Sequence, residues 1–444
     1  MTSTKTYLSR FLSDYGMSVV LVLLCAFFSL VTIEDRPPTG AAAANALARD
    51  LQSTSNVLIL SGVGDVNVQF ADVLQVKLHE GGKTVVERVS GSPADVRAAL
   101  QRSIGAHPPV DAIAMSSDVA ALPFIGKLRE QFPALANARL VSPQKTRWPT
   151  FLNRDNLLNV ATQVVVIALL AVGMTMVIIT GGIDLSVGSL IALAAVVCAY
   201  CIQHWGGGHA SAAAMIGAAT VGIGVCALLG AFSGVLVTAI RLPPFIATLG
   251  VMQIARGVAK IIARGESIYD IPQSFTTLGG GISRIGIPNS VLLMLAAYVI
   301  AHIAMSRTTF GRYVYATGGN LEATRLSGVR VNLVRLAVYT ISGAMGGLGG
   351  IVMTSQLKAG APTYGEMYEL KAIAAVVVGG TSLIGGSGKI FGTLIGALII
   401  AVIENGMNLT GIQSYTQQVV LGAVILAAVV FDLVRRNGRS LFRR

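Results

Sequence analysis

An acidic residue flanked by glycines separates two long apolar stretches, in the segment Thr180-Gly-Gly-Ile-Asp-Leu-Ser-Val-Gly-Ser189. Irregular, glycine-rich backbone at membrane depth is tolerated only where protein buries it or where it lines a polar cavity. An ionisable residue in such a setting is by default a candidate for a transport pathway. We therefore expect Thr180, Asp184 and Ser186 to offer hydrogen-bonding groups to a translocation pathway. The alternative is that Asp184 and the serines cap the next helix, because Asp and Ser are good N-caps; both roles can hold together.

Arg256, Lys371 and Glu404 are further charged residues expected at helix depth. The two cationic side chains could line a polar path for solute hydroxyls, and Arg256 is counted with the pathway for this reason. Long cationic side chains near helix ends also extend back to the membrane interface. The sequence leaves these two interpretations open.

No residue pattern indicates a metal, a cofactor or covalent catalysis. Four cysteines lie inside apolar runs: Cys25, Cys198, Cys201 and Cys226. They are expected to be small buried hydrophobic residues rather than metal ligands or disulfide partners. Gly388-Lys389 is no Walker A motif, because Leu383 and Ile390 stand where that motif needs Gly and Ser or Thr. We expect a chain that is not an enzyme, has no nucleotide site and takes its energy from a partner.

Residues 307–333 form the longest segment expected at the cytoplasmic face, and they combine charges with a short helical pattern. Residues 323–327 can form one or two helical turns, which Gly328 would end by taking a left-handed conformation. Glu322 and Arg325 are three positions apart and so share a helix face. A short helix stopped by glycine is suited to rigid docking; the alternative is an ordinary positively charged loop.

The composition excludes a soluble enzyme core, a disordered chain and a nucleic-acid-binding domain. Of 444 residues, 53% are apolar and 12% charged, whereas soluble domains carry about 25% charged residues. The net charge of +12 comes mostly from basic residues in short segments beside apolar stretches, as in cytoplasmic loops. The composition predicts a polytopic membrane protein with no nucleic acid partner.

Charge density divides the chain, because residues 34–154 hold 24 of its 54 charged residues. The apolar run 17–33 before them is interpreted as a first membrane helix, since it exceeds the 7 to 15 residues usual for the core of a secretory signal. Strand-like and helical runs alternate within the insert, at 57–60, 66–78, 84–89, 93–104, 111–115, 119–132 and 139–141. Such alternation predicts a small α/β layer with a partly parallel sheet.

Nine more apolar segments follow, at about 157–179, 185–203, 210–240, 243–263, 290–306, 333–355, 368–384, 390–407 and 416–434. With the N-terminus in the cytoplasm, the short inside segments carry fourteen Lys and Arg residues and the short outside segments three, a strong positive-inside bias. The expected fold is an all-α polytopic membrane protein of about ten helices, with a small extracytoplasmic α/β domain between helices one and two. The expected divisions are 1–33, 34–154, 155–436 and a cytoplasmic basic tail, 437–444.

Four blocks in order resemble the permease subunits of ribose- and other sugar-type bacterial ABC importers. The blocks are Gly181-Gly-Ile-Asp-Leu-Ser-Val-Gly-Ser189, Pro244-Phe-Ile-Ala-Thr-Leu-Gly250 with Ala255-Arg-Gly257, Gly311-Arg-Tyr-Val-Tyr-Ala-Thr-Gly-Gly-Asn320 with Leu326-Ser-Gly328, and Ala372-Ile-Ala-Ala-Val-Val-Val-Gly-Gly-Thr-Ser382 with Gly385-Gly-Ser-Gly388. The resemblance covers the first helix and about 150–436, but not the insert. The family commonly has Glu-Leu-Asp where this chain has Glu369-Leu370-Lys371.

The resemblance implies inward transport of a sugar or related polar solute across the bacterial inner membrane. A separate ABC ATPase subunit would drive it, a periplasmic solute-binding protein would deliver the solute, and two permeases would pair as a homodimer or heterodimer. The helix with Glu322, Arg325 and Gly328 would then dock to the ATPase. Two alternatives remain open: a secondary transporter, for whose coupling ion only Asp184 and Glu404 qualify, and a membrane-anchored receptor or scaffold that works through the insert.

Overall fold

The computed structural model describes residues 2–105 and 107–441, and the chain divides into two compact units. The first, here called the membrane body, comprises Met1–Thr32 and Thr150–Arg444. The second, here called the α/β unit, comprises Ile33–Pro149. Each unit has its own hydrophobic core.

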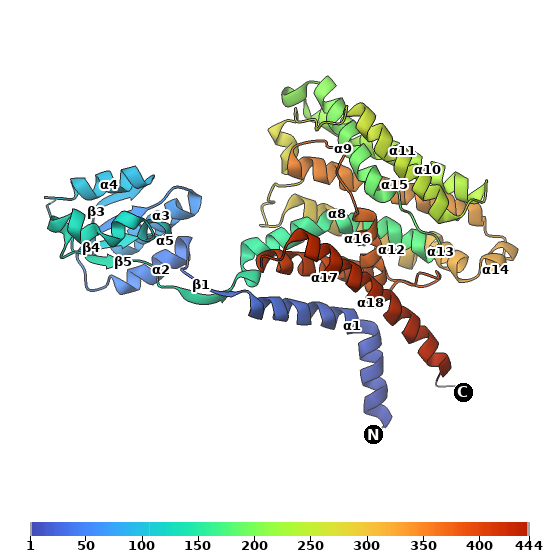
Figure 1. Cartoon of the computed structure of the whole chain (residues 1–444), viewed down its shortest axis with the longest axis horizontal. Coiled ribbons are helices and arrows are strands. Elements are labelled where there is room, and N and C mark those ends of the chain that lie inside the picture. The colour runs from blue at the N-terminus through green and yellow to red at the C-terminus, as the bar shows by residue number, and fades with distance from the viewer. Residues whose placement is uncertain (1, 106, 442–444) are drawn as a thin grey trace. The chain divides into compact units, whose positions relative to one another are not determined.

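The membrane body is helical (Figure 1). Within the described residues, seven of its helices are long and apolar enough to cross a membrane: α8 (Arg154–Ile179), α9 (Val187–His204), α10 (Ala212–Thr238), α11 (Pro244–Ile262), α12 (Asn289–Arg307), α15 (Val331–Leu357) and α17 (Ile390–Leu409). Its other α-helices are α1 (Thr2–Val31), α13 (Thr309–Gly319), α14 (Leu321–Leu326), α16 (Tyr368–Val378) and α18 (Ser414–Leu441). The expectation of a polytopic, mostly helical chain is confirmed.

The span expected at 368–384 is wrong in length, because α16 ends at Val378, before Gly379 and Gly380. Its 11 residues extend about 16 Å at 1.5 Å per residue, roughly half of a 30 Å hydrocarbon core. The apolar parts of α1 and α18, Gly16–Val31 and Ser414–Val430, are also shorter than the seven long helices. In the described residues, ten full-length spans are therefore not confirmed. Helix α18 continues to Leu441, so the tail expected at 437–444 is helical up to there, and 442–444 lie outside the described residues.

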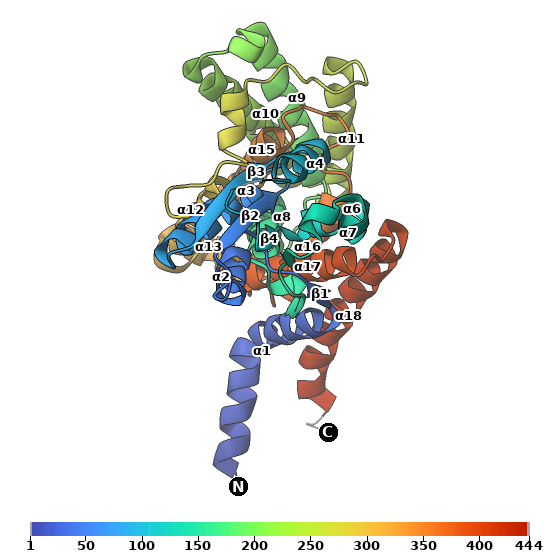
Figure 2. The ribbon, with the colours of Figure 1, turned by 90° about the vertical axis from the view of Figure 1, so that its left-hand side faces the viewer.

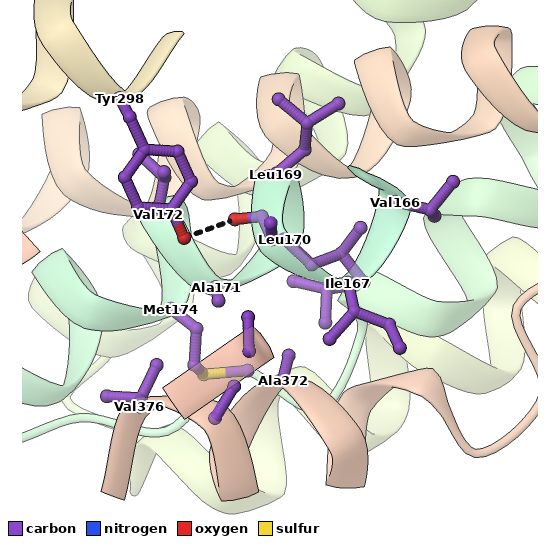
Figure 3. Packing of buried hydrophobic residues seen from close by; sticks show 14 of the residues in the cluster. Val166, Ile167, Leu169, Leu170, Ala171, Val172, Met174, Tyr298, Ala372 and Val376 are labelled. Carbon is purple, nitrogen blue, oxygen red and sulfur yellow. Dashed lines mark hydrogen bonds between the residues drawn. The ribbon is translucent and has the colours of Figure 1, made fainter. Parts of the chain in front are cut away.

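Helix α8 is the centre of the membrane body and packs against α12, α15, α16 and α17. Its residues from Val164 to Ile179 are all buried, as expected of a helix that is apolar on every side. Figure 3 shows Met174 of α8 beside Ala372 and Val376 of α16. The Tyr298 hydroxyl of α12 donates to the Ala168 carbonyl at 3.0 Å (Figure 3), so this buried hydroxyl is satisfied.

The α/β unit contains a four-stranded parallel sheet in the order β3-β2-β4-β5. The strands are β2 (Asn56–Ser61), β3 (Thr84–Ser90), β4 (Ala112–Met115) and β5 (Arg139–Val141), and the helices are α2 (Gly40–Asp50), α3 (Asp65–Glu80), α4 (Pro93–Arg102), α5 (Ser117–Ala120), α6 (Pro123–Gly126) and α7 (Leu128–Gln131). Val57 and Ile59 of β2 pack with α2 and α3, whereas Leu58 and Leu60 pack with α4 to α7. Alternate side chains of β2 thus pack on opposite faces of the sheet. Figure 2 shows the ribbon of these strands and helices.

A two-stranded antiparallel ribbon carries the chain into and out of the α/β unit. Strand β1 (Ile33–Arg36) pairs with β6 (Thr146–Pro149), and Ile33 lies opposite Pro149 in the register. Next to the ribbon, Thr150 donates its N–H to the Thr32 carbonyl at 2.9 Å. The two connections to the membrane body are therefore adjacent.

Candidate functional site

Asp184 is a fully buried carboxylate that joins the loop after α8 to the middle of α15. Its Oδ1 accepts from the Ser186 N–H at 3.0 Å and from the Ser186 hydroxyl at 2.6 Å. Its Oδ2 accepts from the Ser342 hydroxyl at 2.7 Å, and all three residues are buried. An ionised carboxylate has about four acceptor positions, so about one remains for a solute hydroxyl or a water.

The position of Ser342 places this network inside the bundle rather than at its edge. Ser342 is eleven residues into α15, about 16 Å along the helix axis. Ser186 is the N-cap residue of α9, and its hydroxyl donates to Asp184 instead of accepting from the helix. A residue that only caps α9 needs no hydrogen bond to α15. Capping alone therefore does not explain why Asp184 accepts a hydrogen bond from Ser342.

Two further polar groups surround the same loop. The Thr180 hydroxyl donates to the Val177 carbonyl at 2.8 Å, and Arg335 donates to the Thr180 carbonyl at 3.4 Å. The Tyr339 hydroxyl is buried beside Gly182 and has no hydrogen-bond partner among the residues that the structure describes. Unpaired buried hydroxyls are costly and call for an explanation; an unpaired donor near Asp184 is a group that a polar solute or a water can satisfy.

Arg256 lies apart from Asp184 and holds a non-helical segment, residues 358–367, against the bundle. Its Nη1 donates to the carbonyls of Pro362 at 2.8 Å and Tyr364 at 2.7 Å. A Cβ on Gly360 would meet the backbone of Ala195, and one on Gly365 would meet that of Gly188. The non-helical segment therefore packs closely along α9 from Gly188 to Ala195. These two residues are seven positions apart, which corresponds to about 10 Å along the helix axis, at membrane depth.

Unusual backbone angles bound the non-helical segment. Lys358 ends α15 with φ 51°, and Met367 precedes α16 with φ 64°. Left-handed angles at non-glycine residues cost about 1 to 3 kcal/mol each and cluster at functional sites. Irregular backbone at this depth is tolerated where protein buries it or where it lines a polar path, and Arg256 satisfies two of its carbonyls.

Lys371 and Glu404 form an ion pair between α16 and α17. The Nζ and Oε1 atoms are 2.7 Å apart, and both side chains are mostly buried. Lys371 also lies over the Tyr368 ring, 5.1 Å from its centroid. Lys371 stands where the family commonly has Asp, and its positive charge is balanced by the Glu404 carboxylate on the next helix. Glu404 is therefore paired with Lys371.

The residues expected to dock to an ATPase lie on α14 and just after it, and the predicted short helix followed by a left-handed Gly328 is confirmed. Asn320 caps the helix through its Oδ1, which accepts from the Ala323 N–H at 3.0 Å. Gly328 follows the helix with φ 81°, and the Val329 N–H donates to the Thr324 carbonyl at 3.3 Å. Glu322 and Arg325 form an exposed ion pair of 3.8 Å, and Leu326 is 81% exposed beside them.

Helix α13, which precedes α14, contacts the loop between α16 and α17. The Tyr315 hydroxyl donates to the Gly388 carbonyl at 2.9 Å, and the Gly386 N–H donates to the Ile179 carbonyl at the end of α8 at 2.9 Å. Close packing at Gly318 of α13, near Ile179 and Gly386, completes the junction. Helix α13 is therefore connected to the end of α8, next to the Asp184 loop, through contacts at Gly386 and Gly388.

The structure thus unites Thr180, Asp184 and Ser186 in one loop and places Arg256 on a separate contact. Sequence reasoning missed Ser342 and Tyr339, which lie on an apolar helix without any periodic signal. It also missed the non-helical segment, although Pro362 and Gly365 mark it as a chain break. In the described part of the chain no group of three metal-ligating residues is found, and the four cysteines are free.

Residues 156–429 match the family described as "Branched-chain amino acid transport system / permease component". This match covers most of the membrane body and none of the α/β unit. No solved structure matches the chain.

Three curated relatives come from Escherichia coli (strain K12). The ribose import permease protein RbsC is 44% identical over 308 residues, which are 69% of this chain and 94% of the relative. The D-allose transport system permease protein AlsC is 40% identical over 282 residues, 64% of this chain and 84% of the relative. The L-arabinose transport system permease protein AraH is 35% identical over 291 residues, 66% of this chain and 86% of the relative. The resemblance to sugar-type permeases is confirmed, and the chain belongs to the branched-chain amino acid transport system / permease component family.

Proposed function

We propose that this chain is the membrane-spanning subunit of an ABC importer and moves a monosaccharide such as ribose into the cell. The carrying observation is its 44% identity with a ribose import permease over 94% of that protein. The chain has no nucleotide site of its own in this proposal and performs no covalent chemistry. A separate ATPase subunit supplies the energy, and a periplasmic binding protein delivers the solute.

The solute path runs between the Asp184 loop and the non-helical segment 358–367. Asp184 keeps about one acceptor position free, and the nearby Tyr339 hydroxyl has no partner. A neutral polyol can accept from one group and donate to the other without bringing a charge into the membrane. Thr180 and Ser186 shape this loop, whereas Arg256 positions the segment opposite it.

Energy coupling uses the exposed face of α14. Leu326 offers an apolar contact to a partner, and the Glu322–Arg325 pair offers charges beside it. Gly328 ends the helix and sets the direction in which the chain leaves. Through α13, the loop at Gly386 and the end of α8, motion of the ATPase reaches Asp184.

We further propose an inner-membrane topology of ten segments, with both termini and α14 in the cytoplasm and the α/β unit outside. Helices α1, α16 and α18 supply the segments beyond the seven long helices. The fourteen-to-three distribution of basic residues supports this orientation. Two permeases pair, as a homodimer or heterodimer, around one ATPase assembly.

A secondary transporter is less well supported. Its coupling ion would need a free carboxylate at membrane depth. Glu404 is paired with Lys371, which leaves Asp184 of the two candidates, and the 44% identity with a ribose import permease favours an ATP-driven importer. A receptor role for the α/β unit is compatible with transport.

The test is uptake of labelled D-ribose into vesicles that contain the full chain in their membrane. The partner ATPase and ATP are enclosed inside the vesicles, and the binding protein is added outside. We expect uptake that needs ATP and the ATPase and that ionophores do not abolish. D-Allose and L-arabinose are compared in parallel. Uptake that proceeds without the ATPase and follows a proton or sodium gradient would overturn the proposal.

A further inference from the structure

The α/β unit is hollowed at the edge of its sheet where the strands end. One cavity, of about 140 Å³, lies among the residues that follow β2, β3 and β4, and its lining includes Gly62, Pro93 and Asp118. A second, of about 360 Å³, lies beside the ends of β4 and β5, with Arg129 and Ser142 in its lining. Both cavities therefore open at the carboxyl edge of the sheet.

The strand order of the sheet determines which loops flank the first cavity. From β2 the chain passes to β3 on one side of the sheet and then to β4 on the other. The loops that leave the carboxyl ends of β2 and β4 consequently diverge. In open α/β sheets this switch point is where ligands bind, and the cavity between the loops after β2 and β4 occupies it.

Asp118 presents hydrogen-bond acceptors to this crevice. Its Oδ2 accepts from the Asn67 amide at 3.0 Å, and its Oδ1 accepts from the Ser116 hydroxyl. The Ser116 oxygen in turn accepts from the Gly62 N–H at 3.2 Å. A Cβ on Gly62 would overlap the Asp118 carboxylate, so glycine lets that carboxylate lie directly over the end of β2. Two of its roughly four acceptor positions remain unused.

Charge and size restrict the occupant. Asp65 in the first turn of α3, Asp95 in that of α4 and Asp118 all carry negative charge at this edge. Hydrogen bonds from Ser92 lower the pKa of Asp95, so this carboxylate stays ionised and occupies the N-terminus of α4. These charges disfavour an anion. A cavity of about 140 Å³ is below the roughly 300 to 1,000 Å³ of pockets for drug-sized ligands, and so fits a molecule of about one ring.

Apolar groups line the rest of the crevice. Val63 is 73% exposed at its mouth, and Pro93, Val96, Val119 and Leu122 contribute to its wall. A sugar ring has a matching character, with C–H groups on its faces and adjacent hydroxyls at its rim. Two neighbouring hydroxyls can donate to the free positions on Asp118 while the C–H face rests on the valines and the proline.

We propose that this crevice is a binding site for a neutral monosaccharide, separate from the path in the membrane body. The choice of a sugar among polyhydroxy compounds rests on the proposed transport function, whereas the crevice and its acceptor do not. The α/β unit is then a solute receptor covalently joined to the permease. An open site of this size is expected to bind weakly, with a Kd of about 1 mM, or about −4 kcal/mol.

The test labels a single cysteine at the mouth of the crevice, in the purified full chain. Val63→Cys is introduced after the four native cysteines are replaced by alanine, and its rate of alkylation is measured with and without D-ribose. At a sugar concentration of about ten times Kd the rate should fall about tenfold, by the factor 1 + [L]/Kd. Val76→Cys, at a position on α3 that is 55% exposed and outside the lining, serves as the matched control and should not change.

A second pair of variants tests the acceptor. Adding Asp118→Ala should abolish the protection of the cysteine at position 63. Adding Asp72→Ala should leave it unchanged, because Asp72 pairs with Arg88 outside the crevice lining. Hydrogen exchange of the unmodified protein gives an independent readout, with slower exchange expected in residues 62–68 and 116–119 when ribose is present.

The proposal is overturned if D-ribose, D-allose and L-arabinose, each at about 100 mM and so about a hundredfold above the expected Kd, leave both labelling and exchange unchanged. Protection by sulfate instead of sugar would also overturn it, since that would indicate an anion site at a helix N-terminus. These readouts do not involve ATP or uptake. A chain that imports ribose but shows no protection refutes this proposal alone, and protection without ATP-driven uptake refutes only the transport function.

Discussion

Replacing Gly328 with alanine should uncouple solute binding from ATP hydrolysis without affecting the solute path. Gly328 has φ 81°, and a Cβ there would meet no atom within 4 Å. The substitution therefore costs backbone energy only, about 1 to 2 kcal/mol for a non-glycine residue in the left-handed region. Suppose that the conformation in which Gly328 ends α14 and a frayed conformation of this helix end have comparable free energies. The substitution then lowers the population ratio of the ended to the frayed conformation by about 5- to 30-fold.

Gly319→Ala is the matched control for this change. Gly319 is the last residue of α13, lacks a left-handed φ and also has open space around its Cβ position. Alanine is favoured over glycine in helices by up to about 1 kcal/mol, so this variant should be neutral or slightly stabilised. The two substitutions add the same methyl group at positions nine residues apart, with opposite expected effects on local stability.

The assay is ATPase activity in vesicles that contain the permease, its ATPase and the loaded binding protein. Gly328→Ala should reach the membrane normally and lose most of the solute-stimulated rate, while Gly319→Ala keeps it. Hydrogen exchange should quicken at residues 327–331 in the first variant only. Full stimulation in Gly328→Ala, together with faster local exchange, would refute the role of α14 as the coupling element.

Four other predictions concern the pathway and the topology. Asp184→Asn keeps an acceptor, and the Ser342 hydroxyl can rotate to accept from the new amide, so we expect normal membrane abundance with reduced uptake; uptake at the wild-type rate would leave only the structural role. Asp184→Ala leaves buried hydroxyls unpaired at about 1 to 3 kcal/mol and should lower the Tm of the purified protein. Arg256→Lys should weaken the two bonds to the non-helical segment and quicken exchange at residues 360–366 while uptake falls, and unchanged exchange would contradict the positioning role. In intact cells, a cysteine at Gly81 should react with an impermeant reagent and one at Asn320 only after lysis; the reverse pattern would rule out the proposed orientation.

The strands and helices of the α/β unit could be predicted from the sequence where the hydrophobic periodicity and the chain breaks indicate the same boundaries. Residues 57–60, 84–89, 111–115 and 139–141 read as strands and form β2, β3, β4 and β5. The run 119–132 reads as one helix but is divided into α5, α6 and α7, with Pro123 at the start of α6. Strand β1 has no apolar pattern, since Glu34, Asp35 and Arg36 follow Ile33, and only its partner β6 determines it.

The site was predictable only in its local part. Glycines around Asp184 and the stop at Gly328 are visible as residue types with a known backbone preference. Ser342 is 158 positions from Asp184, and pattern reasoning has no access to a contact between segments so far apart. The end of α16 could have been recognised, because Gly379-Gly380 is a helix stop of the same kind as Gly328.

The ribbon of β1 and β6 changes the entropic cost of loop closure in the folding of the membrane body. A disordered insert of the length of Ile33–Pro149 would have to return to its starting point, at an entropic cost of about 4 kcal/mol plus a constant. Because Ile33 and Pro149 are held opposite each other in the ladder, the folded insert presents its two ends already at neighbouring positions, and this closure cost disappears from the folding of the helices on either side. Unfolding of the α/β unit alone would restore the cost between α1 and α8. The two units are therefore linked in stability through the ends of the ribbon.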